Sequence, residues 1–302
     1  MTEPINSAVP KARDIVLDAD GVQLSALLAE PEHLPPRAVV VAVPGGGMKG
    51  GYFHGPAHPS LSLLALGARL GFTVLAVDRP GYGLSASQLP EGMGLAEQSA
   101  TLHAALGDFA LRHQIGAGFF LVAHSYGGKL ALTAAADNRG AELIGMDISG
   151  VSHRYAVDVS QLLDGEGPLN GVRHGALNWG PLRLYPPDTF RLAEPLVSPM
   201  PVREAKEIWR WPEVFPSVAA RLRVPVRFTF AEHERWWRHD EETLSAMRDL
   251  LAAPKVLFAQ HPHAGHNISL GWAARSYHLK ALAFAEECLL TRQLGAWGQG
   301  PR

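Results

Sequence analysis

Hydrophobic residues fall into short, nearly continuous runs along most of the chain. Six runs rich in Val, Leu, Ile and Phe cover Ala38–Val43, Thr73–Val77, Phe119–Ala123, Leu143–Ile148, Val226–Phe230 and Val256–Phe258. Runs of this kind are typical of parallel strands that are covered on both faces. Ahead of them, Ile15–Asp18 and Val22–Glu30 flank an Asp-Gly pair, which predicts an antiparallel β-hairpin.

Between these runs lie segments in which hydrophobic residues recur at helical spacing. These segments cover Leu61–Leu70, Leu95–Arg112, Gly127–Ala136, Glu241–Leu251 and Trp272–Leu290. Strands that alternate with helices predict an α/β fold, in which a mostly parallel sheet is flanked by helices.

The alternation stops between about residues 151 and 222, where no strand pattern appears and Pro, Gly, Trp and Arg are frequent. A structureless loop of this length is uncommon in a compact domain, so we expect a helical insertion. Ligands of open α/β sheets bind outside the carboxyl ends of the strands, where this insertion begins. The predicted organisation is therefore a core of residues 1–150 and 223–302 and a helical cap or lid of residues 151–222.

Composition narrows the possible functions. Lys and Arg number 27 and Asp and Glu 29, a net charge of −2, which removes the main argument for nucleic-acid binding. No apolar stretch approaches ~18 residues, so no membrane span is expected, and the N-terminal segment lacks the apolar core of a signal peptide. Cys288 is the single cysteine, which excludes an intrachain disulfide. We expect a cytoplasmic protein that acts on a small molecule, with its oligomeric state open.

The clearest chemical signal surrounds Ser125. The strand pattern of Phe119–Ala123 leads into Ala123-His124-Ser125-Tyr126-Gly127, and a helix rich in small residues follows. A nucleophile elbow requires this strand–turn–helix context, with small residues on both sides of the serine because the two backbones approach closely. The alternative is a serine that only caps the helix.

Together with two other segments, this motif resembles the α/β-hydrolase fold superfamily, in its serine-nucleophile, lipase- and esterase-like branch. The resemblance spans residues 15–290. Residues 43–47 read Val-Pro-Gly-Gly-Gly, and residues 77–85 read Val-Asp-Arg-Pro-Gly-Tyr-Gly-Leu-Ser. It implies that the backbone N–H groups of Gly46 and Tyr126 form an oxyanion hole, although Pro44 stands where lipase-like members carry His. It also implies a structural role for Asp78.

A serine hydroxyl needs a histidine base, and the histidine needs a carboxylate to orient it. In this fold the chain order is serine, acid, histidine. The resemblance implies Glu234 as the acid and His266, after Ala264-Gly265, as the base. Glu232 and Asp147 are the alternative acids.

Several neighbouring residues have other interpretations. We expect His124 to serve packing and His261 and His263 to be loop or pocket-lining residues. A zinc site made from these histidines is disfavoured because their spacing lacks the helical metal-ligand register. No metal and no cofactor is implied. Gly47, Trp209 and Trp236 are candidates to line the substrate pocket.

The predicted function is a serine hydrolase that cleaves an ester or thioester through an acyl-enzyme. A fold does not fix a function, so two alternatives stay open. One is a lyase or an acyltransferase that uses the same residues, and the other is a non-catalytic small-molecule receptor.

Overall fold

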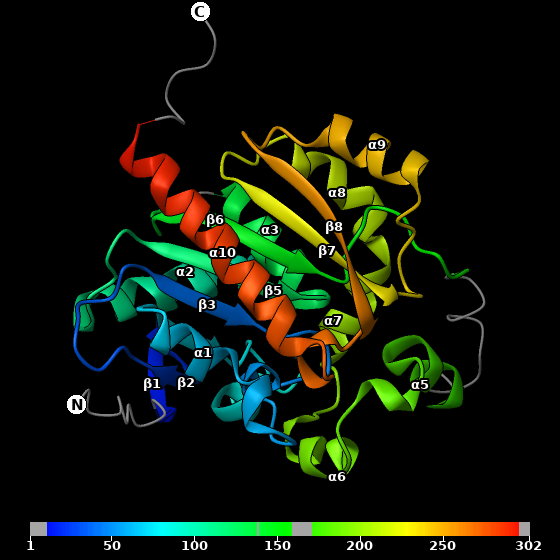
Figure 1. The fold of residues 1–302 in the computed structure, drawn as a ribbon, viewed down its shortest axis with the longest axis horizontal. Helices are drawn as coiled ribbons and strands as arrows, with labels where there is room; N and C mark the ends of the chain where they lie inside the picture. Colours follow the sequence, from blue (N-terminus) through cyan, green and yellow to red (C-terminus); the bar gives the residue numbers. More distant parts are fainter. Residues whose placement is uncertain (1–10, 138, 159–170, 296–302) are drawn as a thin grey trace, which may run out of the picture.

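The computed structural model describes residues 11–137, 139–158 and 171–295. In these residues eight strands form one sheet in the order β1-β2-β4-β3-β5-β6-β7-β8 (Figure 1). Their bounds are β1 Arg13–Ala19, β2 Val22–Ala29, β3 Val39–Val43, β4 Thr73–Val77, β5 Phe119–His124, β6 Leu143–Ser149, β7 Val226–His233 and β8 Val256–Gly265. β2 pairs antiparallel with β1 and β4, and every other neighbouring pair is parallel. The predicted α/β class and mostly parallel sheet are confirmed.

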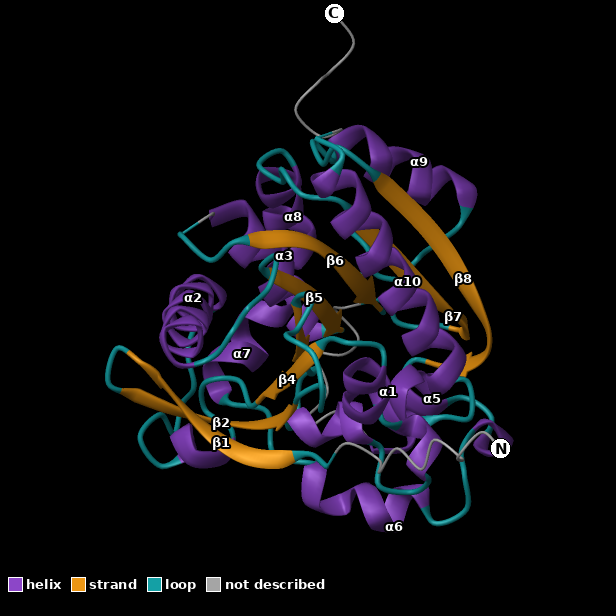
Figure 2. Ribbon diagram, turned by 60° about the vertical axis from the view of Figure 1, so that its left-hand side comes forward, coloured by secondary structure: helices purple, strands orange, loops and turns teal. Residues whose placement is uncertain are grey.

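Helices cover both faces of this sheet. Their bounds are α1 Leu63–Arg69, α2 Leu95–Arg112, α3 Tyr126–Asp137, α5 Gly171–Trp179, α6 Thr189–Ala193, α7 Val202–Glu207, α8 Trp211–Ala219, α9 Glu241–Leu250 and α10 Ala274–Gln293. Figures 1 and 2 show α1 and α10 on one face and α2, α3 and α8 on the other.

Alternation along the central strands creates the two hydrophobic layers. Val39, Val41 and Val43 of β3 belong to the core cluster that contains the buried residues of α2 and α3. Val40 and Ala42 point the other way and belong to the cluster formed with α1 and α10. Because successive side chains of a strand point to opposite faces, a strand buried on both sides must be apolar throughout. This explains the continuous hydrophobic runs of the sequence.

The last two strands are longer than the hydrophobic pattern predicted. β7 continues past Phe230 to His233, and β8 continues past Phe258 to Gly265, with His233 paired to Gly265. The pairing of β7 with β8 shifts register between Ala231 and His233, and its last pairs include the polar residues His233 and His261. The histidines at 261 and 263 therefore lie on a strand, and the prediction that they belong to a loop was wrong.

The segment between β6 and β7 holds helices α5 to α8 and no named strand in its described residues, 151–158 and 171–222. Two isolated bridges connect this region to the rest of the fold, Met48 with Val197 and Tyr155 with Trp237. α8 packs with the sheet, because Trp211 and Phe215 belong to the core cluster on the side of α2 and α3. The predicted cap of residues 151–222 therefore includes α8, which belongs to the core instead.

None of the helices in the described part of the chain is long and apolar enough to cross a bilayer.

Replacing glycine by alanine should change the stability of the fold in opposite directions at Gly127 and Gly107. A Cβ at Gly127 would lie 2.3 Å from the Val43 carbonyl oxygen, whereas a Cβ at the exposed Gly107 in α2 meets nothing within 4 Å. We expect Gly127→Ala to destabilise the fold by about 1–3 kcal/mol or more, because backbone must move. Gly107→Ala should stabilise it by roughly 0.5–1 kcal/mol through helix propensity. Chemical denaturation measures both, and equal effects would contradict the close approach of β3 and α3.

Candidate active site

Ser125 stands alone between a strand and a helix. β5 ends at His124, α3 begins at Tyr126, and Ser125 has φ of 51°, in the left-handed region. Residues other than glycine rarely adopt this conformation, and it persists where the surrounding structure enforces it. Here the enforcing contact is close packing, since a Cβ at Gly45 would lie 3.1 Å from Ser125 Cβ. The turn leaves the serine side chain partly exposed at the end of the strand.

Glu234 and His266 follow directly on the ends of two paired strands, β7 and β8. His266 Nδ1 lies 2.7 Å from Glu234 Oε2, and both side chains are buried. The N–H of Glu234 donates to the Ala231 carbonyl at 3.0 Å, and the N–H of Trp236 donates to Glu234 Oε1 at 2.9 Å. These bonds hold the turn and leave the second carboxylate oxygen to the imidazole.

The carboxylate also determines which nitrogen of His266 carries the proton. A carboxylate only accepts hydrogen bonds, so Nδ1 is the donor and Nε2 of the neutral ring keeps its lone pair. The ring packs against Gly150, where a Cβ would lie 2.7 Å from Cε1. The preceding residue, Ser149, accepts the Ser125 N–H at 2.9 Å. The end of β6 therefore lies between Ser125 and His266.

Within the described residues, no hydrogen bond joins the Ser125 hydroxyl to His266. Hydrogen bonds between a catalytic base and its partner are often long without substrate and tighten in the complex. The arrangement thus brings the two residues to the same edge of the sheet, at the ends of β5 and β8, without a direct bond.

The two alternative acids have other partners. Glu232 is exposed, and its carboxylate accepts the His263 N–H at 2.6 Å. Asp147 is fully buried, lies 2.5 Å from the Arg227 guanidinium and accepts the Tyr277 hydroxyl at 2.9 Å. Of the three carboxylates that the sequence suggested, Glu234 is the one bonded to His266.

The neighbouring histidines differ in environment. His124 is buried and stacks on Tyr52, with ring centroids 5.0 Å apart, and its centroid lies 4.6 Å from that of His266. Burial, and secondarily the charge of His266, holds the pKa of His124 well below its ordinary value. His261 bonds to the Ser276 hydroxyl, and burial above all lowers its pKa to about 4, whereas the His263 side chain is 85% exposed.

The described residues contain no group of three or more His, Cys, Asp or Glu side chains arranged to hold a metal ion. The cysteine is no competing nucleophile, because burial raises the pKa of the Cys288 thiol to about 12 and so disfavours the reactive thiolate.

Gly46 and Tyr126 lie next to each other beside the serine. A Cβ at Gly46 would lie 3.8 Å from Tyr126 Cβ and 2.3 Å from the terminal methyl of Met200. As the first residue of α3, Tyr126 has no acceptor for its N–H within the helix. The Gly46 N–H has no acceptor among the described residues either. Two unpaired donors at one spot are suited to an oxygen that gains negative charge.

A strand-like segment of the insertion runs along this loop. The Ser198 N–H donates to the Gly47 carbonyl, and the Lys49 N–H donates to the Leu196 carbonyl, each at 2.9 Å. This pairing carries Met200 to its position against Gly46. No sequence pattern predicts this contact, because the two segments are about 150 residues apart and the bonds join backbone atoms.

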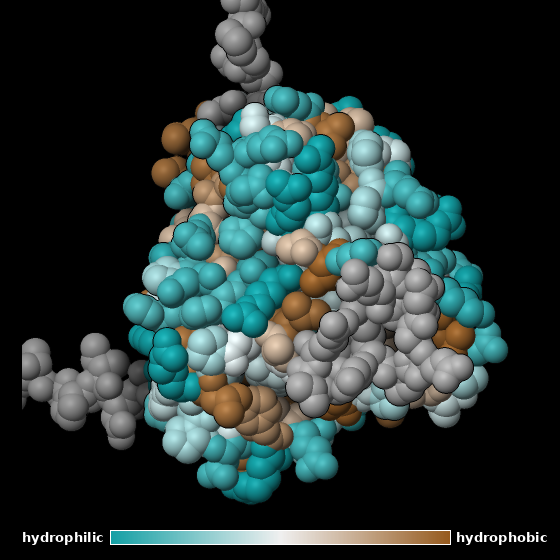
Figure 3. All heavy atoms as spheres, turned by 90° about the vertical axis from the view of Figure 1, so that its right-hand side faces the viewer, coloured by the Kyte–Doolittle hydropathy of each residue, from teal (hydrophilic) through white to brown (hydrophobic). Residues whose placement is uncertain are grey.

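Aromatic side chains continue from His266 into the insertion. The Trp236 ring lies 6.5 Å from the His266 ring, and the Trp209 ring lies 6.5 Å from Trp236. Trp236 Nε1 donates to the side chain of Asn178 in α5 at 2.8 Å, a further contact that the sequence did not reveal. On the face of the molecule at the right-hand side of Figure 1, hydrophobic residues lie among hydrophilic ones (Figure 3).

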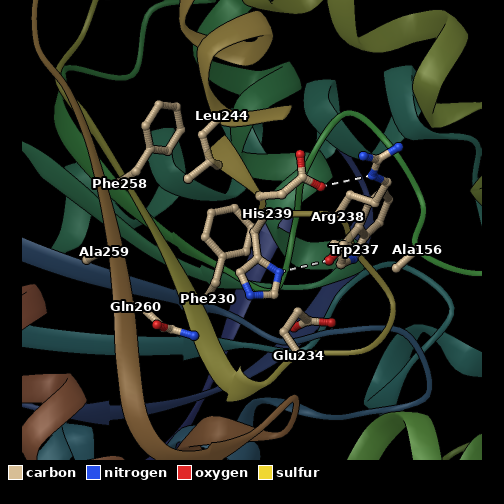
Figure 4. Close-up of a pocket in the computed structure, with 11 residues that line it drawn as sticks. Ala156, Phe230, Glu234, Trp237, Arg238, His239, Leu244, Phe258, Ala259 and Gln260 are labelled. Carbon is tan, nitrogen blue, oxygen red and sulfur yellow. Dashed lines mark hydrogen bonds and ion pairs between the residues drawn. The ribbon is translucent and has the colours of Figure 1, made fainter. Parts of the chain in front are cut away.

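A cavity of about 570 Å³ lies beside Glu234, between the end of β7, the first half of β8 and the start of α9 (Figure 4). Phe230 and His239 stack in it at a centroid distance of 5.1 Å, and Glu234 lines its edge. Neither Ser125 nor His266 lines this cavity. It meets the candidate site only through Glu234.

A sequence model described as the alpha/beta hydrolase family matches residues 40–283 of the chain. A comparison with curated proteins finds no match. Among solved structures, a carboxyl esterase from Bacillus coagulans has a TM-score of 0.66 and 18% identity, covering 94% of this chain and 100% of its own. A monoglyceride lipase from Saccharomyces cerevisiae has a TM-score of 0.65 and 12% identity, covering 95% and 98%.

A third similar structure is 2-hydroxy-6-oxo-6-phenylhexa-2,4-dienoate hydrolase from Rhodococcus sp. strain RHA1. It has a TM-score of 0.62 and 15% identity, covering 91% of this chain and 99% of its own. At such identities the likeness establishes the fold and leaves the chemistry to the residues of the site.

Proposed function

Because the chain belongs to the alpha/beta hydrolase family, we propose that it is a serine hydrolase that cleaves an ester or thioester of a small organic or acyl substrate. The observation that carries this proposal is the buried 2.7 Å bond between His266 and Glu234, close to a serine in an enforced left-handed turn. A base oriented by a carboxylate beside a strained, partly exposed serine is the arrangement that nucleophilic catalysis requires.

In the proposed mechanism, the hydroxyl oxygen of Ser125 attacks the substrate carbonyl carbon while His266 Nε2 takes the hydroxyl proton. Glu234 stabilises the resulting imidazolium through Nδ1 and remains a carboxylate. The oxygen of the tetrahedral intermediate accepts hydrogen bonds from the N–H groups of Gly46 and Tyr126.

The second half of the reaction releases the acyl group. The imidazolium of His266 protonates the leaving alcohol or thiol as the tetrahedral intermediate collapses to an acyl ester on Ser125. Water then attacks this ester, with His266 again as the base, and the acid product leaves. All proton transfers use residues of this chain, so the mechanism requires no cofactor.

We further propose that the part of residues 151–222 that precedes α8 forms the cap, and that aromatic residues at this cap choose the substrate. Trp209, Trp236 and Met200 give the site an apolar border, which suits a hydrophobic acyl or aryl group. Gly47 belongs to this border, because its backbone binds the segment that carries Met200.

The nucleophile can be identified by covalent labelling. We expect a fluorophosphonate to attach once per chain, at Ser125, and Ser125→Ala to lose both labelling and ester hydrolysis. Peptide mass spectrometry locates the label. Attachment at another residue, or wild-type turnover by Ser125→Ala, would be incompatible with the proposed nucleophile.

Two glutamates separated by one residue give a matched test of the acid. Glu234→Gln removes the charge that stabilises the imidazolium and should lower kcat by roughly 10³–10⁴-fold. Glu232→Gln changes a carboxylate that faces His263 and should alter kcat by less than about 3-fold, an exposed-site effect. His266→Ala should nearly abolish turnover. A greater loss in Glu232→Gln than in Glu234→Gln would reject the assignment.

The role of the cap is tested by substrate preference. Trp209→Ala should reduce kcat/KM for esters with a large apolar acyl group by about 10-fold, the scale of 1–3 kcal/mol for lost apolar contact. It should change kcat/KM for a small activated acetate ester by less than about 3-fold. Trp209→Phe, which keeps an aromatic ring, is the control. An equal loss on both substrates would argue against a pocket role.

A further inference from the structure

A buried guanidinium supports the loop that carries Gly46. Arg79 Nε donates to the Pro44 carbonyl and Nη2 donates to the Gly45 carbonyl, each at 3.0 Å. Only 1% of the Arg79 side chain is exposed. One rigid, planar side chain thus holds two successive carbonyls of the loop, a task that suits the fixed donor geometry of arginine.

The bond to Gly45 also fixes the direction of the Gly46 N–H. The Gly45 carbonyl and the Gly46 N–H belong to one peptide group, which is planar and trans, so the two bonds point in opposite directions. While the carbonyl points at Arg79, the N–H points away from it. Gly45 itself packs on Ser125, because a Cβ added at Gly45 would lie 3.1 Å from Ser125 Cβ.

Arg79 contacts the residue of the second candidate donor as well. Its guanidinium carbon lies 4.7 Å from the centre of the Tyr126 ring and 4.6 Å from that of Tyr82. The Tyr82 hydroxyl in turn accepts the Gly47 N–H at 3.0 Å. The residue before Gly46, the residue after it and the Tyr126 side chain are therefore all linked to this one arginine.

The partner of Arg79 comes from the insertion. Both oxygens of Glu204, in α7, receive hydrogen bonds from Arg79, and its side chain has no exposed surface. Glu204 also accepts the Tyr82 hydroxyl at 2.8 Å and the Gln98 amide at 3.0 Å. A buried ion pair contributes little net stability compared with apolar residues of the same volume, so its presence under the loop calls for another role.

We propose that Arg79, held in place by Glu204, is a positioning residue that aims the Gly46 N–H at the substrate oxyanion. The insertion therefore does more than cover the site, because through Glu204 it sets the geometry of the oxyanion hole. This inference rests on the proposed function. Arg79 touches no reacting atom and acts through the Pro44 and Gly45 carbonyls.

A comparison of an ester with its thionoester isolates this role. The thiolate-like sulfur that develops in a thionoester accepts hydrogen bonds poorly, so its reaction gains little from the oxyanion donors, whereas the oxygen ester depends on them. Arg79→Lys keeps a positive charge beside Glu204 but loses the planar guanidinium, whose fixed donors hold both carbonyls in one orientation. We expect kcat for the ester to fall about 10–100-fold, a smaller decrease than the removal of one oxyanion donor causes. KM should change less than about 3-fold. The thionoester should lose less than about 3-fold in kcat.

Arg227→Lys is the matched control, because Arg227 forms another buried arginine–carboxylate pair, with Asp147, on the strands β7 and β6. It should lower the melting temperature without changing the ratio of ester to thionoester rates. Glu204→Gln retains the shape of the carboxylate and should shift the ratio in the same direction as Arg79→Lys, by less. It is the variant to rely on if Arg79→Lys does not yield folded protein.

The outcomes separate this inference from the proposed function. Wild-type protein that hydrolyses neither substrate would contradict both. If the wild type hydrolyses the ester, two results would overturn the positioning role alone. One is an equal loss of kcat on the ester and the thionoester in Arg79→Lys and Glu204→Gln, and the other is no loss in either folded variant.

Discussion

The left-handed turn at Ser125 exists because a strand and a helix are forced together around it. A side chain larger than hydrogen at Gly127 would overlap the backbone of β3, and Gly45 packs on Ser125 from the neighbouring loop. This close approach brings the loop that contains Gly45 and Gly46, the serine and the start of α3 into one small region. The φ of 51° at Ser125 is strained for a residue other than glycine. The two hydrophobic layers packed against the sheet hold the backbone in this conformation.

Topology then supplies the remaining groups of the site. β6, β7 and β8 lie in order beside β5, and residues that follow β7 and β8 reach the same edge of the sheet. Glu234 and His266 occupy those positions and bind each other. The sheet sets the strand ends that carry Glu234 and His266, and the insertion supports them, since Asn178 of α5 accepts the Asn267 N–H at 3.1 Å and the Trp236 Nε1–H at 2.8 Å. The loop that contains Gly46 receives hydrogen bonds from Arg79, whose partner Glu204 belongs to the insertion. In the proposed hydrolase, the sheet thus places the acid and the base, and the insertion contacts both this pair and the loop that contains Gly46.

Local signals made much of this predictable. The hydrophobic runs predicted the strands β3 to β8, and the Asp-Gly turn predicted the hairpin of β1 and β2. The central strands are recognisable as apolar runs because burial on both faces demands apolar residues at nearly every position. Ser125 was predictable from the small residues that a tight elbow requires. Contacts made by Met200 and Glu204 were not, because backbone pairing and a buried ion pair between distant segments leave no periodic pattern. The ends of β7 and β8 were also missed, since their ladder continues through polar residues such as His261.

The central claim is that acyl transfer passes through Ser125, and the acyl-enzyme itself is the most direct evidence. An activated aryl ester with a bulky acyl group, mixed with the enzyme and quenched in acid within the first turnover, should leave one acyl group per chain on the peptide that contains Ser125. The adduct should disappear at the rate of steady-state hydrolysis. Recovery of the acyl group on another residue, or release of free acid in the first turnover without any adduct, would contradict the account.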